Sequence, residues 1–493
     1  MPTHDQLAYT PDQVREMDRI AIEKLGIPGS TLMSRAGAAV FRLGRQHFPR
    51  IDRWLVLCGA GNNAGDGYVI AHLARDAGLD VTVIALSDPQ KLSGDAAWAY
   101  GQFREAGGQV EDFEPVLCEH AGLIIDAMLG TGLDRPLGGV YRDAVQAVAG
   151  STAPVIAVDV PTGLNAATGE VMGAAVTAVF TVTFVGLKQG LFINAGPDHA
   201  GQVVFDGLGI PPDALGGFQP SFALFGPRDL AEVLAPRPAT AHKGLFGHVL
   251  VIGGNHGMAG AVRMAGEAAL RGGAGLVTVA TRPAHAASIV TARPELMCVG
   301  VDDAPALAPL LERATVLAIG PGLGRDDWAH AMLQAALDAP QPKVLDADAL
   351  NLLAEMPSRR SDWVLTPHPG EAARLLGMST ADVQSDRLSA VGALAKRYGG
   401  VCVLKGRGTL VAEPDSLPWL IDRGNPGMAT AGMGDVLTGV TAALLAQSGL
   451  SAKSVAAAAF GHACAGDRAA EAGQRGLLAS DLLTELRVCL NPS

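Results

Sequence analysis

Residues 54–86 read WLVLCGAGNNAGDGYVIAHLARDAGLDVTVIAL, in which two apolar runs flank a glycine-rich turn and a helix-length segment. The runs at 54–58 and 80–86 have the length and the branched side chains of buried strands. A strand, a turn, a helix and a second strand make a βαβ unit, whose two strands run parallel. The stretch therefore predicts an α/β fold.

The same alternation of short Val, Ile and Leu runs with Ala-rich stretches continues on both sides of a break. Between about 206 and 240 the sequence becomes rich in Pro and Gly, and the alternation restarts at HVLVIGGNHGMAGAVRMAGEAALRGGAGLVTVAT, residues 248–281. We expect two tandem three-layer α/β/α domains, at 1–215 and 225–490, each with a parallel sheet. A surface-docked helix with a capping box at Thr10 precedes the first domain's strands.

Composition excludes several classes of protein. The net charge of −12 argues against binding to nucleic acid or to anionic membranes, which depend on clustered Lys and Arg. No secretory signal pattern opens the chain, and its most apolar uncharged stretches, 171–187 and 436–452, are too short to span a bilayer. The six cysteines form no CxxC pair, as expected for reduced thiols. We expect a soluble cytoplasmic protein without nucleic-acid or membrane partners, and a homo-oligomer.

The turn at 59–67, GAGNNAGDG, departs from the GxGxxG pattern of dinucleotide-binding turns. After Gly59 and Gly61 the next glycine, Gly65, comes one residue late, and residues 62–63 and Asp66 bring side-chain oxygens into the turn. A carboxylate repels phosphate, but it suits a cation or a substrate hydroxyl. The turn by itself is equally compatible with left-handed asparagines and an aspartate that caps the helix.

Two further predicted strands also end in oxygen-bearing residues. Asp126 lies in IIDAMLGTGLDRP, residues 124–136, and Asp159 and Thr162 lie in IAVDVPTGLN, residues 156–165. Ligands of parallel sheets gather at the carboxyl ends of strands, so we expect one crevice there. Its hard oxygens suit a monovalent or hard divalent cation. Lys188 is either an ordinary solvated lysine or a charge partner for bound phosphate.

The strongest local signal is GNPGMATAGMGDVLTGVTAALLAQSG, residues 424–449. Gly432 and Gly434 precede Asp435 at the start of a predicted helix, where free backbone amides form an anion hole beside a carboxylate. In ribokinase-like folds such an aspartate removes a proton from the acceptor hydroxyl while the helix N-terminus neutralises the moving phosphoryl group. A plain helix-stabilising aspartate, worth about 0.3–1 kcal/mol, explains less well the glycines packed upstream.

Three other stretches support that interpretation. VLKGRGTLV, residues 403–411, gives a strand, Lys405 and a turn suited to a nucleotide. TPHPGEAARLLG, residues 366–377, resembles the TPNxxE motif of vitamin kinases, whose glutamate orders magnesium, with His368 in place of Asn and Glu371 retained. Asp346 and Asp348 in LDADALNLL follow another strand, and they either join the site or cap the next helix.

The motifs GAGNNAGDG, LGTGL and VDVPTG resemble GPGNNGGDG, LGTGL and VDxPSG of the amino-terminal domain of NAD(P)H-hydrate repair enzymes; Ala60, Ala64 and Thr162 are departures. The resemblance implies a Rossmann-like domain that epimerises the C6-hydrated nicotinamide of NADHX and NADPHX. Asp159 is the candidate acid/base, unless it only caps its turn. The resemblance implies potassium at Asn63, Asp126 and Thr162, and hydrate contacts from Asn62, Asn63, Ala64, Gly65, Asp66, Gly130, Thr131, Gly132, Leu133, Asp134, Arg135, Pro136 and Asp159.

The later motifs GGNHGMAGA, GPGLGRD, LDADALN, TPHPGE, KGRGT and GNPGMATAGMGD are similar to those of the ADP-dependent dehydratase domain of the same family; Thr430 and Ala431 are departures. The resemblance implies a ribokinase-like domain that phosphorylates the C6 hydroxyl of the S hydrate from ADP, with Mg²⁺, and expels phosphate to restore NAD(P)H, leaving AMP. Asp435 is then catalytic. The implied hydrate contacts are Ala261, Gly322, His368 and Asp435, and the implied nucleotide contacts are Lys405, Gly406, Arg407, Gly408, Thr409 and Gly434.

Two other functions are compatible with these motifs. A ribokinase-like vitamin kinase with an accessory dinucleotide-binding domain would transfer phosphate to a stable alcohol. A non-catalytic nucleotide-binding protein would keep the glycine loops but would have little use for Asp435 in an anion hole.

Overall fold

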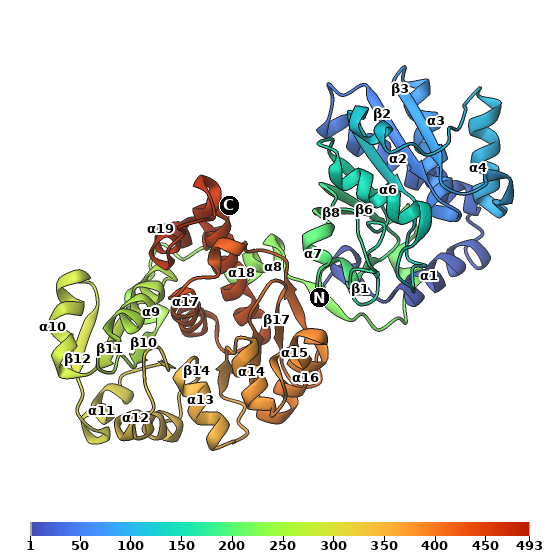
Figure 1. The fold of residues 1–493 in the computed structure, drawn as a ribbon. Helices are drawn as coiled ribbons and strands as arrows, with labels where there is room; N and C mark the ends of the chain where they lie inside the picture. The colour runs from blue at the N-terminus through green and yellow to red at the C-terminus, as the bar shows by residue number, and fades with distance from the viewer. Residues whose placement is uncertain (1, 493) are drawn as a thin grey trace. The chain divides into compact units, whose positions relative to one another are not determined.

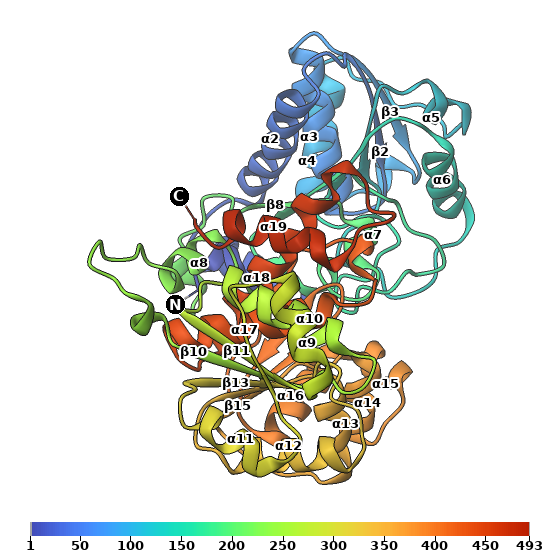
Figure 2. The same cartoon turned by 90° about the vertical axis from the view of Figure 1, so that its left-hand side faces the viewer.

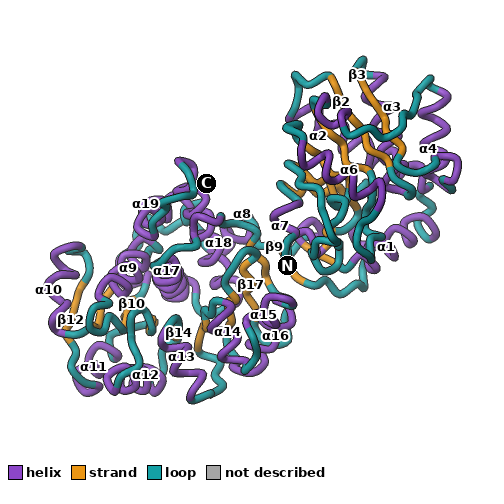
Figure 3. The backbone as a smooth tube through the Cα atoms, viewed as in Figure 1, coloured by secondary structure: helices purple, strands orange, loops and turns teal. Residues whose placement is uncertain are grey.

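The computed structural model describes residues 2–492 and divides into two compact units (Figure 1). Unit 1 ends at Phe222 and unit 2 begins at Ala223. Each unit has its own sheet and its own buried core of Val, Ile, Leu and Ala side chains. Figure 3 shows strands and helices alternating along the backbone of each unit.

The sheet of unit 1 is wholly parallel, in the order β3-β2-β4-β5-β6-β8. Its strands are β2 (Arg53–Cys58), β3 (Asp80–Ala85), β4 (Leu123–Ala127), β5 (Val155–Val158), β6 (Phe180–Phe184) and β8 (Gln202–Asp206). One face carries α2 (Gly29–His47), α3 (Asn62–Asp76) and α4 (Gly94–Glu105), and the other carries α5 (Val116–His120) and α6 (Gly139–Gly150) (Figure 2). The predicted three-layer α/β/α architecture is confirmed.

The chain enters unit 1 through a short strand and a capped helix. β1 (Leu7–Tyr9) pairs in parallel with β7 (Leu187–Lys188). In α1 (Pro11–Glu23) the Thr10 hydroxyl accepts a hydrogen bond from the Gln13 amide, so the predicted capping box is present. Val14 and Met17 are buried on its inner side. Unit 1 is completed by α7 (Gly196–His199).

Unit 2 has a mixed sheet in the order β12-β11-β10-β13-β14-β15-β16-β17-β18-β9. The expected parallel pairing is present from β12 to β16, whereas β17 runs antiparallel to both β16 and β18. Residues 405–408 between β16 and β17 are too few for a parallel crossover, so the two strands form a hairpin with Leu404 opposite Leu410. The strands are β9 (Phe222–Leu224), β10 (His248–Ile252), β11 (Leu276–Thr281), β12 (Met297–Gly300), β13 (Val316–Ile319), β14 (Lys343–Leu345), β15 (Trp363–Leu365), β16 (Val401–Leu404), β17 (Thr409–Ala412) and β18 (Trp419–Ile421).

Helices cover both faces of this sheet, which makes a three-layer unit (Figure 2). One face carries α9 (Ala259–Arg271), α17 (Met433–Ser448) and α18 (Ala452–Ala469), with α19 (Ala479–Cys489) packed outside them. Because α17 lies between the sheet and these helices, almost all its side chains are buried, and its small Ala and Gly residues permit that close packing. The other helices are α8 (Pro227–Val233), α10 (Pro283–Ala292), α11 (Ala304–Leu311), α12 (Asp327–Asp338), α13 (Asp348–Glu355), α14 (Pro369–Leu376), α15 (Thr380–Ser385) and α16 (Arg387–Tyr398).

None of the helices between residues 2 and 492 combines the length and apolar composition that crossing a bilayer requires. All six cysteines are free thiols.

Candidate active sites

A cavity of about 770 Å³ opens at the carboxyl ends of the strands of unit 1. Ala64 and Gly65 do not line it: they face the interior, where a Cβ on Gly65 would come within 2.6 Å of Met33. The glycine therefore allows α2 and α3 to pack closely. The other residues expected to contact the hydrate all line the cavity, namely Asn62, Asn63, Asp66, Gly130, Thr131, Gly132, Leu133, Asp134, Arg135, Pro136 and Asp159.

The unusual turn of unit 1 is the first turn of a helix. Gly61 has extended backbone and is the N-cap, so α3 begins at Asn62 and Asp66 is too far along it to cap it. Asp66 is instead nearly buried and lines the cavity. Burial raises its pKa well above the usual value, and the nearby carboxylates of Asp159 and Asp18 raise it further. Burial and the acidic neighbours of Asp66 thus favour its protonated form.

Asp126 and Thr162 form a fully buried pair beside this cavity. The Thr162 hydroxyl donates to Asp126 Oδ1 across 2.6 Å, and its backbone amide donates to Oδ2 across 2.8 Å. The Leu129 amide donates to the same hydroxyl oxygen. Burial raises the pKa of Asp126 to about 6, although the bonds from Thr162 oppose this. In the described chain no cationic side chain bonds to the Asp126 carboxylate. A bound cation would therefore stabilise its buried negative charge.

Asn63 completes the predicted potassium ligand set. A Cβ built on Gly130 would lie 3.4 Å from Asn63 Oδ1, so the amide lies against the turn that follows Asp126. Its buried nitrogen has no hydrogen-bond partner, and exchange of the amide oxygen and nitrogen would place an oxygen there. Carboxylate, hydroxyl and amide oxygens are ligands for a hard cation. The residues present therefore fit potassium.

Asp159 has an unusual backbone conformation, and its side chain makes three polar contacts through one oxygen. It has a φ of 66°, in the left-handed region that aspartate tolerates better than most residues. Lys188 Nζ lies 2.5 Å from its Oδ1, and the Thr183 hydroxyl and Phe184 amide donate to the same oxygen. Lys188 is only 2% exposed and also donates to the Phe184 carbonyl. The prediction of a solvated lysine is wrong, since Lys188 is a buried partner of Asp159.

Asp18 is a cavity residue that the sequence did not reveal. It lies on α1, lines the cavity and has a pKa raised to about 6, mainly by burial; Lys188 lowers this pKa and Asp159 raises it. Nothing in its local sequence distinguishes it from the other acidic residues of that helix. Asp18, Asp66 and Asp159 thus line the cavity together with the buried Lys188, and Asp95 and Asp134 line it as well. These groups are able to exchange protons with a bound hydroxyl.

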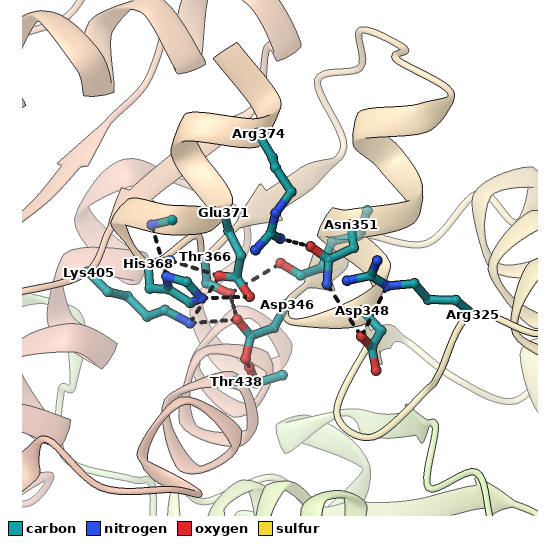
Figure 4. A network of polar contacts seen from close by, with 12 residues as sticks. Arg325, Asp346, Asp348, Asn351, Thr366, His368, Glu371, Arg374, Lys405 and Thr438 are labelled. Carbon is teal, nitrogen blue, oxygen red and sulfur yellow. Dashed lines mark hydrogen bonds and ion pairs between the residues drawn. The ribbon is translucent and has the colours of Figure 1, made fainter. Parts of the chain in front are cut away.

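In unit 2, a buried ion pair lies at the centre of the second site (Figure 4). Lys405 Nζ lies 2.7 Å from Asp346 Oδ1 and 3.9 Å from Glu371. The hydroxyls of Thr366 and Thr438 each donate to Asp346 across 2.9 Å. Burial opposes ionisation of Asp346, but Lys405 and the two hydroxyls outweigh it and lower its pKa. Asp346 therefore joins the site and is not simply a helix cap.

Asp435 stands in the first turn of α17 beside this ion pair. Gly432, the N-cap, has a φ of 89°, which glycine adopts without strain. A Cβ on Gly434 would lie 3.3 Å from both Asp346 Oδ2 and Lys405 Nζ, so this glycine brings the helix N-terminus against the pair. Burial raises the pKa of Asp435 to about 7, and Asp346 raises it further while Lys405 opposes the shift. Such a carboxylate can act as a general base near neutral pH.

His368 is the N-cap of α14. Its ring accepts a hydrogen bond from the Gly370 amide across 3.0 Å, and Glu371 accepts one from the His368 amide across 2.8 Å. Burial lowers the pKa of the imidazole, and the positive charges of Lys405 and Arg374 lower it further. The ring is half-exposed, so a neutral imidazole faces the site from this helix end.

The two remaining predicted hydrate contacts lie next to each other. A Cβ on Gly322 would come within 3.3 Å of the Ala261 methyl group and 2.7 Å of Met258. Gly322 has a φ of 56°, which favours glycine, and a side chain there would also collide with the segment at Met258 and Ala261. The same loop is tied to the β14 end by a bond from the Gly324 amide to Asp348.

The loop at 405–409 joins β16 to β17. The Lys405 amide donates to the Pro367 carbonyl across 2.9 Å, and the Arg407 guanidinium donates to the Gly424 carbonyl across 2.7 Å. These bonds connect the loop with the His368 turn and with the glycine-rich segment before α17. The predicted nucleotide residues are thus brought to one edge of the sheet.

Comparison with known proteins finds a family match for each part of the chain. Residues 29–190 match the family model described as YjeF-related protein N-terminus, and residues 249–487 match that described as NAD(P)H-hydrate dehydratase. A ribokinase-like superfamily protein of Enterococcus faecalis, of solved structure, aligns with a TM-score of 0.52 and 31% identity over 56% of this chain and 96% of its own. The ribokinase-like fold predicted for unit 2 is confirmed.

Whole-chain relatives carry both parts in the same order. The bifunctional NAD(P)H-hydrate repair enzyme of Coxiella burnetii is 47% identical over 98% of this chain and 99% of its own length. That of Escherichia coli is 46% identical over 98% of this chain and 93% of its own. Similarity of this extent, across both units, shows that the chain belongs to the family of bifunctional NAD(P)H-hydrate repair enzymes.

Proposed function

We propose that this chain restores hydrated NADH and NADPH in two steps. The domain expected at 1–215, within unit 1, interconverts the R and S forms of NADHX and NADPHX. The domain expected at 225–490, within unit 2, dehydrates the S form at the expense of ADP. The observation that carries the proposal is the placement of Asp435 at the N-terminus of α17 beside the Lys405–Asp346 pair. A phosphoryl acceptor site requires a base and a positive electrostatic field at one point.

In the dehydratase, one residue acts as the general base, and other groups supply the positive electrostatic field. Asp435 accepts the proton of the C6 hydroxyl as its oxygen attacks the β-phosphorus of ADP, and AMP leaves. The helix amides and the Lys405 ammonium stabilise the negative charge of the transferring group. Phosphate then departs with the C6 oxygen while a proton leaves C5, which restores the ring double bond. Ala261, Gly322 and His368 would contact the hydrate, and residues 405–409 with Gly434 would hold the nucleotide.

The donor set near Lys405 suits a magnesium ion that arrives with the nucleotide. Mg²⁺ usually takes one or two carboxylates together with substrate phosphates. Glu371 is the carboxylate that the motif assigns to this role, and it is nearly buried beside Lys405. When bound, the ion would neutralise phosphate charge, and Glu371 would hold it in place.

For the epimerase, proton transfer takes place in the acidic cavity of unit 1. The C6 hydroxyl of the hydrate leaves as water when protonated, and water returns to the opposite face as a proton is withdrawn. Asp159 carries this proton, and Lys188 fixes its orientation. Asn63, Asp126 and Thr162 would hold potassium, which supplies fixed positive charge near the dinucleotide. The other cavity residues of the 62–66 and 130–136 turns would bind the substrate.

The decisive experiment is incubation of the purified chain with mixed NADHX epimers, ADP and magnesium, followed by chromatography of both epimers. We expect both to disappear while NADH, AMP and phosphate accumulate in equal amounts. Without ADP, an unequal mixture should only relax to its equilibrium ratio. A stable phosphorylated alcohol would favour the vitamin-kinase alternative, and binding of ADP without turnover would favour the binding-module alternative.

The remaining details need separate measurements. Parallel reactions with ATP test the proposed preference for ADP, and replacement of potassium by sodium should slow epimerisation only. The expected homo-oligomeric state is tested by light scattering of the purified protein, and the cytoplasmic location by cell fractionation.

A further inference from the structure

Arg387, the first residue of α16, is a buried cation without a carboxylate partner. Arg387 is 7% exposed, and within residues 2–492 its guanidinium forms no ion pair. Burial lowers its pKa to about 10, so it stays charged at neutral pH. Burying an unpaired charge costs free energy unless hydrogen bonds compensate. The acceptors around Arg387 must supply that compensation.

Most of those acceptors are carbonyls within the predicted nucleotide loop or directly before it. The guanidinium donates to the carbonyls of Leu404, Lys405 and Gly408 across 3.2–3.4 Å. It also donates to the Gln384 side chain across 2.7 Å. The planar, forked guanidinium thus bonds to three carbonyls at the two ends of the loop. The ammonium group of a lysine lacks this planar fork and cannot reproduce the arrangement.

The Gly406 amide faces away from Arg387, and two further amides of the loop are unbonded within residues 2–492. In a trans peptide the carbonyl and the following amide point in opposite directions, so the Gly406 amide points away from Arg387. In the described chain, the amides of Gly406, Arg407 and Gly408 donate to no protein acceptor. The left-handed φ values of Gly406 and Gly408, 140° and 66°, allow these successive amides to form a concave surface. Such a surface binds anions.

We infer that Arg387 is a positioning residue that turns the amides of residues 406–408 toward the phosphates of the adenine nucleotide. This inference rests on the proposed function, because it assumes that the nucleotide binds at residues 405–409. Arg387 acts through the loop, from behind it. The positive charge of its guanidinium also favours a nearby phosphate.

Kinetics with ADP can separate positioning from a purely structural role. Arg387→Met removes the charge and the fork, and Arg387→Lys keeps the charge alone. We expect KM for ADP to rise about tenfold or more in Arg387→Met and less in Arg387→Lys, because each loosens the amides that hold phosphate. KM for the hydrate and the epimerase rate should stay unchanged. Arg397→Met, at an exposed arginine of the same helix, is the matched control and should leave KM for ADP unchanged.

Direct binding of ADP, measured by calorimetry, keeps the test independent of turnover. If the lysine and methionine variants bind ADP as tightly as the unaltered chain and only melt earlier, Arg387 is structural and the inference fails. If Arg387→Met does not fold, Arg387→Lys decides by the same criterion. If the unaltered chain binds ADP but releases no NADH, the proposed function fails, while the ratio of ADP affinities still decides the role of Arg387. If it binds no ADP, both fail.

Discussion

The ammonium group of Lys405 lies 2.7 Å from Asp346 Oδ1, and both groups lie against Gly434 in the first turn of α17. The pair therefore joins the β14 end, the β16 end and the helix N-terminus at one point. Asp346 orients the lysine, and Thr366 and Thr438 orient Asp346. The position of the Lys405 ammonium group therefore depends on a buried carboxylate that two threonine hydroxyls hold in place.

Replacing Asp346 by Asn should destabilise unit 2 by about 3 kcal/mol, because the largely buried Lys405 loses its nearest carboxylate and keeps only the longer ion pair with Glu371. The pKa of Asp346 is lowered in the folded state, so its stabilisation is present above the ordinary aspartate pKa and is lost as pH falls below it. Differential scanning calorimetry at neutral and acidic pH measures this. Asp338→Asn, at the exposed end of α12, is the control, and an equal melting temperature for the two variants would contradict the prediction.

Asp435→Asn should lower the dehydratase rate by roughly 10²–10⁴-fold, the usual contribution of a general base, while epimerisation continues at its normal rate. Since the amide is almost the same size, ADP should still bind. Rates of NADH appearance and of epimer exchange, measured on one preparation, give the two values. Turnover of the S hydrate at the normal rate would remove Asp435 from the catalytic role.

The dehydratase should gain activity as pH rises through about 7. Asp435 accepts a proton only when ionised, and burial raises its pKa to about 7, so the protonated, inactive form prevails below that pH. The quantity to measure is kcat/KM for the S hydrate in the free enzyme as a function of pH. A flat profile across this region would show that another group limits the reaction.

Lys188→Met should slow epimerisation by about tenfold or more, because Asp159 loses the donor that fixes its orientation. We also expect a loss of roughly 2 kcal/mol in stability, less than for a fully buried pair because Asp159 is 17% exposed. Epimer exchange and thermal melting test both effects. Lys91→Met, at a lysine whose side chain is 84% exposed, should change neither.

Thr162→Val should raise the potassium concentration needed for half-maximal epimerisation by about tenfold, since the valine keeps the volume and loses the oxygen. Thr162→Ser keeps the hydroxyl and should retain the normal potassium requirement. Titration of epimerase activity with potassium chloride, at constant ionic strength with choline chloride, compares them. Equal requirements in the valine and serine variants would exclude Thr162 as a ligand.

Potassium should stabilise unit 1 more strongly above pH 6 than below it. The pKa of Asp126 is about 6 in the folded protein, above its ordinary value of 3.8, so without a cation this group costs stability as pH rises between these values. A bound cation offsets that cost only where the carboxyl group is ionised. Melting temperatures with potassium and with choline, on both sides of pH 6, measure the difference; a potassium effect independent of pH would argue against Asp126.

Local patterns sufficed for the parts of each site that lie within one strand–turn–helix unit. The strand before residue 59, the helix beginning near Asn62 and the glycines before Asp435 are all consecutive in the chain, so their periodicity and turn chemistry predict them. The antiparallel direction of β17 could also be predicted from the sequence, because a four-residue connection between two strands indicates a hairpin.

Contacts between distant segments were not predictable in this way. Lys188 was interpreted as solvated or phosphate-bound, since a single lysine after a strand carries no sign of its partner 29 residues earlier. Asp18 lies in a segment whose pattern is that of a surface helix, so the sequence does not mark it as a cavity residue. Arg387 contacts the Lys405 carbonyl, which lies 18 residues later in the chain. Each depends on tertiary packing.

The hairpin register of β16 and β17 limits how this protein can vary. Leu404 faces Leu410, so the intervening segment has a fixed length. One inserted or deleted residue would slip the pairing and turn every following side chain of β17 to the opposite face of the sheet. We therefore expect natural variants of this chain to differ in side chains at constant spacing between Leu404 and Leu410, without gaps there.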